Sequence, residues 1–300
     1  MTNSPLETER SRTADSESTV QVPFTKSSDH ESGDSSVIRR VEALAGQIEE
    51  LSNLFDFDMS YEVQPLDYEL PSTFKLSIVI PVYNEEATLR AIMGRVVSIP
   101  VPKEVILVDD CSTDGTREIL SDFEQVSGIQ VLYKSRNEGK GAALRSGFEI
   151  ASGDIIVIQD ADLEYDPRDI PRLLKSIVAG HADVVYGSRF LGEELQDPSW
   201  LHRFGNRLLS RASNLLTGLK LTDMETCYKA FRRELLDDIT IRQDRFGFEP
   251  EITAKLARRG ARFQEVPISY DGRGYEEGKK IGFKDAVNAL YCILRFGLAD

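Results

Sequence analysis

The feature that most constrains the fold of this chain is an alternation of short apolar runs with amphipathic segments between residues 76 and 158. Apolar runs rich in β-branched residues predict strands at 76–81, 104–110, 129–133 and 155–158. Helical periodicity predicts helices between them at 85–98, 113–125 and 141–151. Strands and helices in this order favour an α/β fold, a mostly parallel twisted sheet flanked by helices.

Polar side chains follow each of the four predicted strands. The segments that carry them are Tyr83–Glu86, Asp109–Asp110, Lys134–Asn137 and Asp160–Asp162. Ligands bind α/β sheets beyond the carboxyl ends of the strands, so four successive polar ends predict a functional site at that edge.

Asp160 and Asp162 come directly after the buried run 155–158, and Glu164 lies two residues further on. Carboxylates at i and i+2 of an extended segment point to the same side, so both can bind one hard cation. A cation held there can neutralise the charge on a departing diphosphate. Acidic turns after strands are common and usually only solvated, but this position predicts the chemistry of a nucleotide-sugar transferase.

The loops after the first two strands suit a nucleotide. Tyr83 can stack on a base or ribose, and Asp109 or Asp110 can accept a hydrogen bond from a base imide or a ribose hydroxyl. The alternative is that Ser112 or Thr113 caps the next helix and the aspartates only favour its positive end.

The turn 137–142 leads into a helix and holds a lysine between two glycines. It can bring backbone N–H groups and Lys140 close to a phosphate. Its spacing is not that of a Walker A sequence, so it gives little support for a kinase or NTPase.

Composition divides the chain into four predicted parts. Residues 1–37 predict a disordered acidic tail, because so few apolar side chains cannot offset the ordering entropy. Residues 38–73 predict an amphipathic helix over 38–54 and an acidic linker. That helix suits either a coiled coil joining copies of the chain or packing on its own domain. A catalytic domain is expected over 74–285, and a C-terminal amphipathic helix over 286–300.

The formal net charge of −14 is unevenly distributed. Residues 1–75 carry 15 acidic and 6 basic residues, a balance of −9, and the remaining 225 residues carry −5. No basic stripe dominates, so no nucleic-acid partner is expected. The three cysteines lack paired spacing and the three histidines are scattered, so neither a disulfide framework nor a histidine-based metal cluster is predicted.

The chain shows no leader and no apolar run near the ~18 residues that a spanning helix needs. The expected location is cytoplasmic, with any lipid contact made at the cytoplasmic membrane surface. The helical pattern from Phe283 to Leu298 has an apolar face with basic neighbours, which suits a membrane interface or packing on the domain.

Four segments, in order and in spacing, resemble glycosyltransferase family 2. They are Ile80–Glu86, Val108–Thr116, Asn137–Ala142 and Asp160–Glu164. The resemblance extends over residues 76 to about 285 and is greatest to dolichyl-phosphate mannose synthase-like and polyprenyl-phosphate glucosyltransferase-like enzymes. It implies a GT-A nucleotide-diphospho-sugar fold, dependence on Mg²⁺ or Mn²⁺, and inverting transfer.

The resemblance also implies roles for individual residues. A metal would be bound by Asp160, Asp162 and Glu164, the last standing where the synthases usually have Gln. The expected nucleotide-binding residues, with Lys140 of the glycine turn, are Pro81, Tyr83, Glu85, Val108, Asp110, Lys140, Asp160 and Ala161.

The second half of the chain resembles segments that hold an acceptor phosphate. Tyr186–Phe190 supplies Arg189, and Arg203 matches a second arginine more loosely, because 192–199 fits an insertion. Residues 266–282 resemble a loop that brings Arg273 and Lys280, or Lys279, to the active site. That loop departs from the family pattern by Gly278 in place of serine and by one extra residue. Asp162, Arg189 and Arg273 are thus the expected catalytic residues.

The nature of the acceptor decides whether a base is needed. A phosphate acceptor is already an anion near neutral pH, so it needs positioning and charge neutralisation, for which arginine is suited. A hydroxyl acceptor would instead need a carboxylate base, and Glu249 and Glu251 are the candidates.

The expected function is therefore transfer of a hexose from a nucleoside-diphosphate sugar, of the GDP-mannose or UDP-glucose type, to a polyprenyl or dolichyl phosphate. One alternative is a family 2 enzyme with a soluble or glycan hydroxyl acceptor. Another is a non-catalytic scaffold that recruits a partner through the tail and the 38–54 helix, although paired carboxylates would gain it nothing. A nucleotidyltransferase shares the fold but fits the Arg189 and Arg273 segments poorly.

Overall fold

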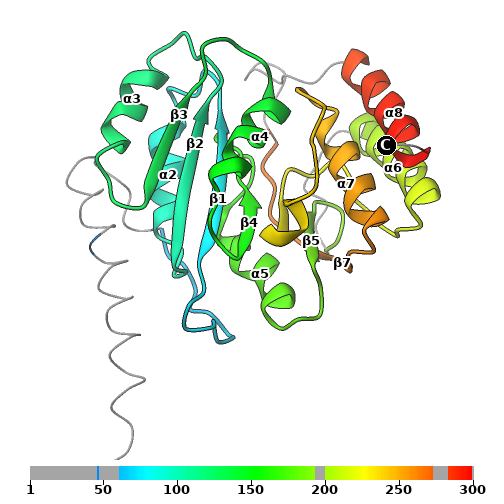
Figure 1. Cartoon of the computed structure of the whole chain (residues 1–300), viewed down its shortest axis with the longest axis horizontal. Helices are drawn as coiled ribbons and strands as arrows, with labels where there is room; N and C mark the ends of the chain where they lie inside the picture. Colours follow the sequence, from blue (N-terminus) through cyan, green and yellow to red (C-terminus); the bar gives the residue numbers. More distant parts are fainter. Residues whose placement is uncertain (1–45, 47–60, 193–199, 273–282, 299–300) are drawn as a thin grey trace, which may run out of the picture.

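The computed structural model describes residues 46, 61–192, 200–272 and 283–298. In these ranges a seven-stranded sheet has the order β3-β2-β1-β4-β6-β5-β7 (Figure 1). The strands are β1 (Leu76–Val82), β2 (Lys103–Asp109), β3 (Ile129–Tyr133), β4 (Ile155–Ile158), β5 (Val184–Ser188), β6 (Lys229–Arg232) and β7 (Phe263–Pro267). Only β6 pairs antiparallel, with β4 and β5, so the predicted mostly parallel sheet is confirmed.

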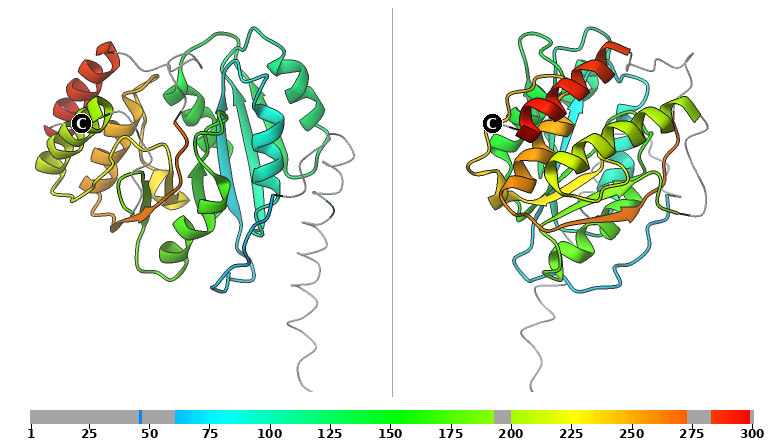
Figure 2. Two further views of the ribbon diagram at one scale, coloured as in Figure 1. Left: turned by 180° about the vertical axis from the view of Figure 1, so that it is seen from behind. Right: turned by 90° about the vertical axis from the view of Figure 1, so that its right-hand side faces the viewer.

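Helices cover both faces of the sheet. One face carries α2 (Leu89–Val97), α3 (Thr116–Phe123) and α5 (Ile170–Val178), and the other carries α4 (Lys140–Ile150) and α7 (Phe248–Arg258). Two further helices, α6 (Trp200–Thr217) and α8 (Phe283–Leu298), pack against α7 and against each other at one end of the molecule (Figures 1 and 2). Short 3₁₀ turns follow β4 and β6 at η1 (Pro167–Asp169) and η2 (Arg233–Leu236).

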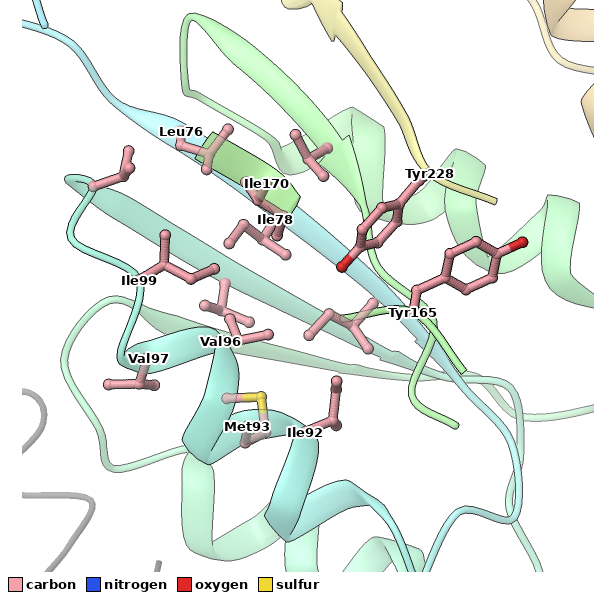
Figure 3. Close-up of a cluster of buried hydrophobic side chains, with 14 of the residues drawn as sticks. Leu76, Ile78, Ile92, Met93, Val96, Val97, Ile99, Tyr165, Ile170 and Tyr228 are labelled. Carbon is pink, nitrogen blue, oxygen red and sulfur yellow. The ribbon is translucent and has the colours of Figure 1, made fainter. Parts of the chain in front are cut away.

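The central strands β1, β2 and β4 are mostly apolar because both of their faces are buried. On β1, Ile78 and Ile80 face one core cluster and Val79 faces the other. Figure 3 shows the first cluster, in which Ile92 and Met93 of α2 lie against the sheet. Burying each such side chain stabilises the fold by about 1.5–3 kcal/mol.

Two predicted helices begin later than expected. The helix expected from residue 85 begins at Leu89, and the helix expected from residue 113 begins at Thr116. The alternative in which Ser112 or Thr113 caps the second helix is therefore wrong, because the residue before the helix is Gly115. Asp114 instead accepts a hydrogen bond from the backbone N–H of Thr116 at 3.0 Å, which places the turn before the helix.

The N-terminal predictions fall largely outside the described residues. The tail 1–37 and the helix 38–54 lie there, apart from Gly46, which is helical. The described part of the linker, 61–73, has no regular secondary structure, but Leu66, Tyr68 and Leu70 pack on the core. Among the described helices, none has the length and the apolar character needed to cross a membrane.

The order in which strands are added to the sheet reverses at β1. The chain places β2 and β3 on one side of β1 and then β4 on the other side. In α/β sheets the loops diverge at such a point, and ligands bind in the crevice at the carboxyl ends of the strands. The pairing of β1 with β4 ends at Val79 and Ile158, so Pro81, which has no N–H, interrupts no hydrogen bond there. The candidate site lies at this crevice.

Candidate active site

The loops after β1 and β2 are joined by side-chain hydrogen bonds. Asn84 adopts a φ of 55°, a conformation that asparagine tolerates, and its Oδ1 accepts from the N–H of Thr113 at 2.8 Å. The N–H of Glu85 donates to Thr116 Oγ1 at 2.9 Å. The carboxylate of Glu85 is buried and accepts a hydrogen bond from Thr88 Oγ1 at 2.8 Å, which stabilises the turn before α2. Tyr83, directly before these two anchored residues, is half-buried.

Asp109 and Asp110 are both buried and both hold neighbouring loops. Asp109 accepts from Arg117 Nε at 2.6 Å, which links the end of β2 to α3. Asp110 accepts from the N–H groups of Glu138 at 3.0 Å and Gly139 at 2.6 Å. Asp110 therefore orients the glycine turn, and its expected contact with a nucleotide stays a prediction.

The glycine turn depends on the absence of side chains. Gly139 has a φ of 105°, and a Cβ there would lie 2.6 Å from the carbonyl oxygen of Asp244. At Gly141 a Cβ would lie 2.2 Å from the carbonyl oxygen of Gln243. The turn thus packs directly on the loop before α7, and α4 begins with Lys140 aimed into the crevice.

Lys140 is the cation at the centre of the described site. Its Nζ lies 2.7 Å from Asp160 Oδ1, 2.7 Å from Cys227 Sγ and 3.8 Å from Glu249 Oε1. Burial alone would lower the pKa of Lys140, but the adjacent Asp160 carboxylate raises it well above its ordinary value. The lysine therefore carries a permanent positive charge beside the first aspartate of the predicted metal motif.

The loop after β4 carries the three predicted metal ligands, Asp160, Asp162 and Glu164. Asp162 Oδ1 accepts from the N–H of Glu164 at 3.2 Å, and Leu163 between them has a φ of 65°. In the described ranges no three His, Cys, Asp or Glu side chains already converge as a metal cluster. The donor set still fits a hard dication, because carboxylate oxygens are the ligands that Mg²⁺ and Mn²⁺ prefer.

Arg189 lies at the end of β5 and is paired with a residue that the sequence did not single out. Its Nε and Nη2 donate to the two oxygens of Asp223 at 2.7 and 2.8 Å, and both side chains are buried. Burial opposes the charge, yet Asp223 raises the pKa of Arg189 well above its ordinary value. The guanidinium also lies 5.1 Å from the ring centre of Tyr270, whose hydroxyl donates to Glu164 at 2.9 Å. These contacts connect β5 to the predicted metal motif.

The two candidate bases, Glu249 and Glu251, have different surroundings. Glu251 accepts from the N–H groups of Arg242 and Gln243 and from Lys255 Nζ, so it fixes the loop before α7. Glu249, two residues before it in the same helix, is buried and faces Lys140, and its Oε2 has no hydrogen-bond partner among the described residues. Of the two carboxylates, Glu249 is the one at the site.

Two further buried ionisable groups, Glu225 and Lys229, interact with Glu249. Burial, with repulsion from Glu249, raises the pKa of Glu225, and burial lowers the pKa of Lys229. Lys229 Nζ donates to the carbonyl of Met224 at 2.9 Å and lies 4.1 Å from the ring centre of Tyr186. Both shifts disfavour the charged forms, so this buried carboxyl and this buried amine resist ionisation beside Glu249.

The remaining predicted residues are distributed as follows. Val108 and Ala161 are buried in the two core clusters, so any contact with a nucleotide would fall to their backbone. Arg203 lies on α6 in a separate cleft beside Phe190. Arg273, Lys279 and Lys280 lie outside the described residues.

Four residues of the site were missed from the sequence: Asp223, Cys227, Glu225 and Lys229. They lie in the segment before β6 and at its first residue, far in sequence from the metal motif. No local pattern marks them, because their partners lie on other elements.

Comparison with known proteins agrees with this arrangement. The glycosyl transferase family 2 model matches residues 77–240. An undecaprenyl-phosphate 4-deoxy-4-formamido-L-arabinose transferase from Aeromonas hydrophila subsp. hydrophila is 35% identical over 222 residues. That alignment covers 72% of this chain and 65% of the relative, so the chain spans slightly less than two thirds of that protein's length.

Solved structures of glucosyl-3-phosphoglycerate synthase from Mycobacterium tuberculosis share the fold. The complex with Mn²⁺, UDP and phosphoglyceric acid has a TM-score of 0.57 at 21% identity, covering 79% of this chain and 87% of that one. The complex with Mg²⁺ and UDP has a TM-score of 0.58 at 20% identity, covering 84% of each chain. The predicted GT-A fold is confirmed, and the chain belongs to glycosyl transferase family 2.

Proposed function

We propose that this protein is a metal-dependent inverting glycosyltransferase that moves a hexose from a nucleoside diphosphate to a polyprenyl phosphate. The observation that carries the proposal is the Lys140–Asp160 pair at the crevice between β1 and β4. The acceptor class is supported by the 35% identity to a transferase named for undecaprenyl phosphate.

On the donor side, the described residues offer charge for a diphosphate. Lys140 would contribute its permanent positive charge. The N–H groups of Glu138 and Gly139 already donate to Asp110, so they hold the turn that presents Lys140. A divalent cation held by Asp160, Asp162 and Glu164 would neutralise charge on the leaving diphosphate. The structural neighbours crystallised with Mn²⁺ or Mg²⁺ and UDP support that use of a metal.

On the acceptor side, an oxygen of the lipid phosphate would attack the anomeric carbon. A new carbon–oxygen bond forms, the bond to the diphosphate breaks, and the nucleoside diphosphate leaves with both bonding electrons. No proton has to be removed, because the phosphate is already an anion. Arg189, Arg203, Arg273 and Lys280 are the residues proposed to position it.

The test is transfer of labelled sugar from UDP- and GDP-hexoses, with Mg²⁺ or Mn²⁺, into solvent-extractable polyprenyl phosphate. We expect label in the lipid phase with the wild type and none with Asp162→Asn. Donor that binds only with metal but leaves the lipid unlabelled would exclude the lipid acceptor. Absence of metal-dependent nucleotide binding would instead favour the non-catalytic scaffold.

A hydroxyl acceptor is the second candidate, and the unpartnered Oε2 of Glu249 is the observation that favours it. That oxygen could take the proton of an attacking hydroxyl. The discriminating variant is Glu249→Gln, which keeps the shape and removes the base. Under the phosphate-acceptor proposal its turnover stays within about tenfold of the wild type, whereas loss of a general base lowers turnover about 10²–10⁴-fold.

A further inference from the structure

Exposed apolar side chains are concentrated on two helices. In the described part of the chain, eight of the nine large apolar side chains that are exposed belong to α6 or α8. They are Phe204, Leu208, Leu215, Val287, Leu290, Tyr291, Leu294 and Leu298. The two helices lie side by side on the outside of the molecule, as the right-hand view of Figure 2 shows. We call this surface the α6–α8 face.

The same face is positively charged. A cleft of about 700 Å³ lies between α6 and the segment 218–222, and the described residues that line it include the cations Arg203, Arg207, Arg211 and Lys220 and no acidic residue. The three arginines are spaced four residues apart and so form one row along the helix. No residue of α6 is acidic, in a chain whose formal net charge is −14.

A buried amide in this cleft lacks partners. Asn206 is 5% exposed and lines the cleft, and neither its Nδ2 nor its Oδ1 has a hydrogen-bond partner within the described ranges. An unpartnered buried amide is costly, so its retention points to a ligand with polar oxygens. The neighbouring Asn214 and Ser210 are, by contrast, already bonded to the backbone of Leu221 and Met224.

We propose that the α6–α8 face docks on an anionic lipid bilayer, with a lipid headgroup phosphate in the α6 cleft. The apolar side chains would enter the acyl boundary, and the arginine row would lie at the level of the phosphates. Asn206 would donate its amide N–H to a headgroup oxygen. This docking does not depend on the sugar-transfer reaction, and it would hold for either acceptor.

A second copy of the chain fits this face less well. A symmetric dimer places the same patch on both subunits, so the cations of one copy would meet the cations of the other. Like charges at an interface oppose association, whereas a bilayer that contains anionic lipid neutralises all of them. The positive charge of the α6–α8 face therefore favours an anionic lipid surface over a second copy of the chain as its partner.

The experiment is co-sedimentation of the full chain with vesicles of phosphatidylcholine, alone or mixed with an equal amount of phosphatidylglycerol. We expect binding to the mixed vesicles that weakens as salt is raised. Each cation near an anionic surface contributes about fivefold to partitioning, so Arg207→Glu with Arg211→Glu should reduce binding at least about 25-fold. Both side chains are exposed, so this variant should keep the circular dichroism and melting temperature of the wild type.

Two further variants complete the test. Arg90→Glu reverses one charge on α2, on the far side of the sheet, and should bind the mixed vesicles like the wild type. Leu290→Ser with Leu294→Ser should reduce binding to the mixed vesicles at every salt concentration. Equal binding by the α6 variant and the wild type would overturn the proposal. So would a concentration-dependent dimer that the α6 variant or the α8 variant abolishes.

Discussion

Replacing Lys140 by Met tests whether the positive charge of Lys140 compensates the negative charge of the carboxylates at the candidate site. The Nζ–Oδ1 distance of 2.7 Å to Asp160 corresponds to an attraction of about 6 kcal/mol at an effective dielectric constant of about 20. Desolvation of the ammonium offsets part of this attraction, and breaking a largely buried pair costs about 3–5 kcal/mol. Both side chains of the pair are 15% exposed, so we expect a loss near 3 kcal/mol at pH 7.

The assay is urea unfolding of the metal-free protein, beside Lys175→Met as the matched control. Lys175 pairs with Asp67, and both side chains are more than half exposed, so its loss should cost about 0–1 kcal/mol. Lys140→Met should also weaken binding of a nucleoside diphosphate. If the two variants unfold at the same urea concentration, Lys140 does not compensate buried carboxylates and the reasoning fails.

Three other perturbations test the surrounding structure. Asp223→Asn leaves a buried arginine without its counter-charge and should lower the free energy of unfolding by about 3–5 kcal/mol, measured in urea. Gly141→Ala should lower the free energy of unfolding by about 1–3 kcal/mol, because the new Cβ would lie 2.2 Å from the carbonyl oxygen of Gln243. Gly205→Ala, in open space on α6, should raise the free energy of unfolding by about 0.5–1 kcal/mol. Hydrogen bonds from Arg262 lower the pKa of Asp183 to about 2, so its stabilisation is present above about pH 4 and is lost as the pH falls towards 2. The free-energy difference between wild type and Asp183→Asn should shrink over that range, and a constant difference would contradict the assignment.

The first half of the fold could be predicted from the sequence because its signals are local. The strands at 129–133 and 155–158 agree residue for residue with β3 and β4. The continuous apolar run of β4 is typical of a strand that is buried on both faces. The helix starts were misplaced because Glu85 and Asp114 sit in positions that also suit a first helical turn. In the structure both side chains bond to the turns instead.

The second half gave weaker signals. β6 is only four residues long and contains a fully buried lysine, Lys229, which a hydrophobicity pattern counts against a central strand. Its antiparallel insertion between β4 and β5 depends on contacts that are distant in sequence. For the same reason the Arg189–Asp223 pair could not be predicted from the sequence, although Arg189 itself was identified through the family resemblance.

The distribution of charge bears on the choice of acceptor. Lys140 is matched by Asp160 and Glu249, and two nitrogens of Arg189 are committed to Asp223, so the described centre of the site has little spare positive charge. Among the described residues, the α6 cleft is lined by four cations and by no acidic side chain.

A phosphate acceptor would therefore approach from α6, past Arg203, and a hydroxyl acceptor would not need that charge. We expect Arg203→Gln to raise the KM for a polyprenyl phosphate about tenfold or more, the value of one charge-assisted contact of about 1.5–3 kcal/mol. The KM for the nucleotide sugar should stay unchanged. The opposite pattern, an unaffected KM for the lipid together with turnover that depends on Glu249, would assign the reaction to a hydroxyl acceptor.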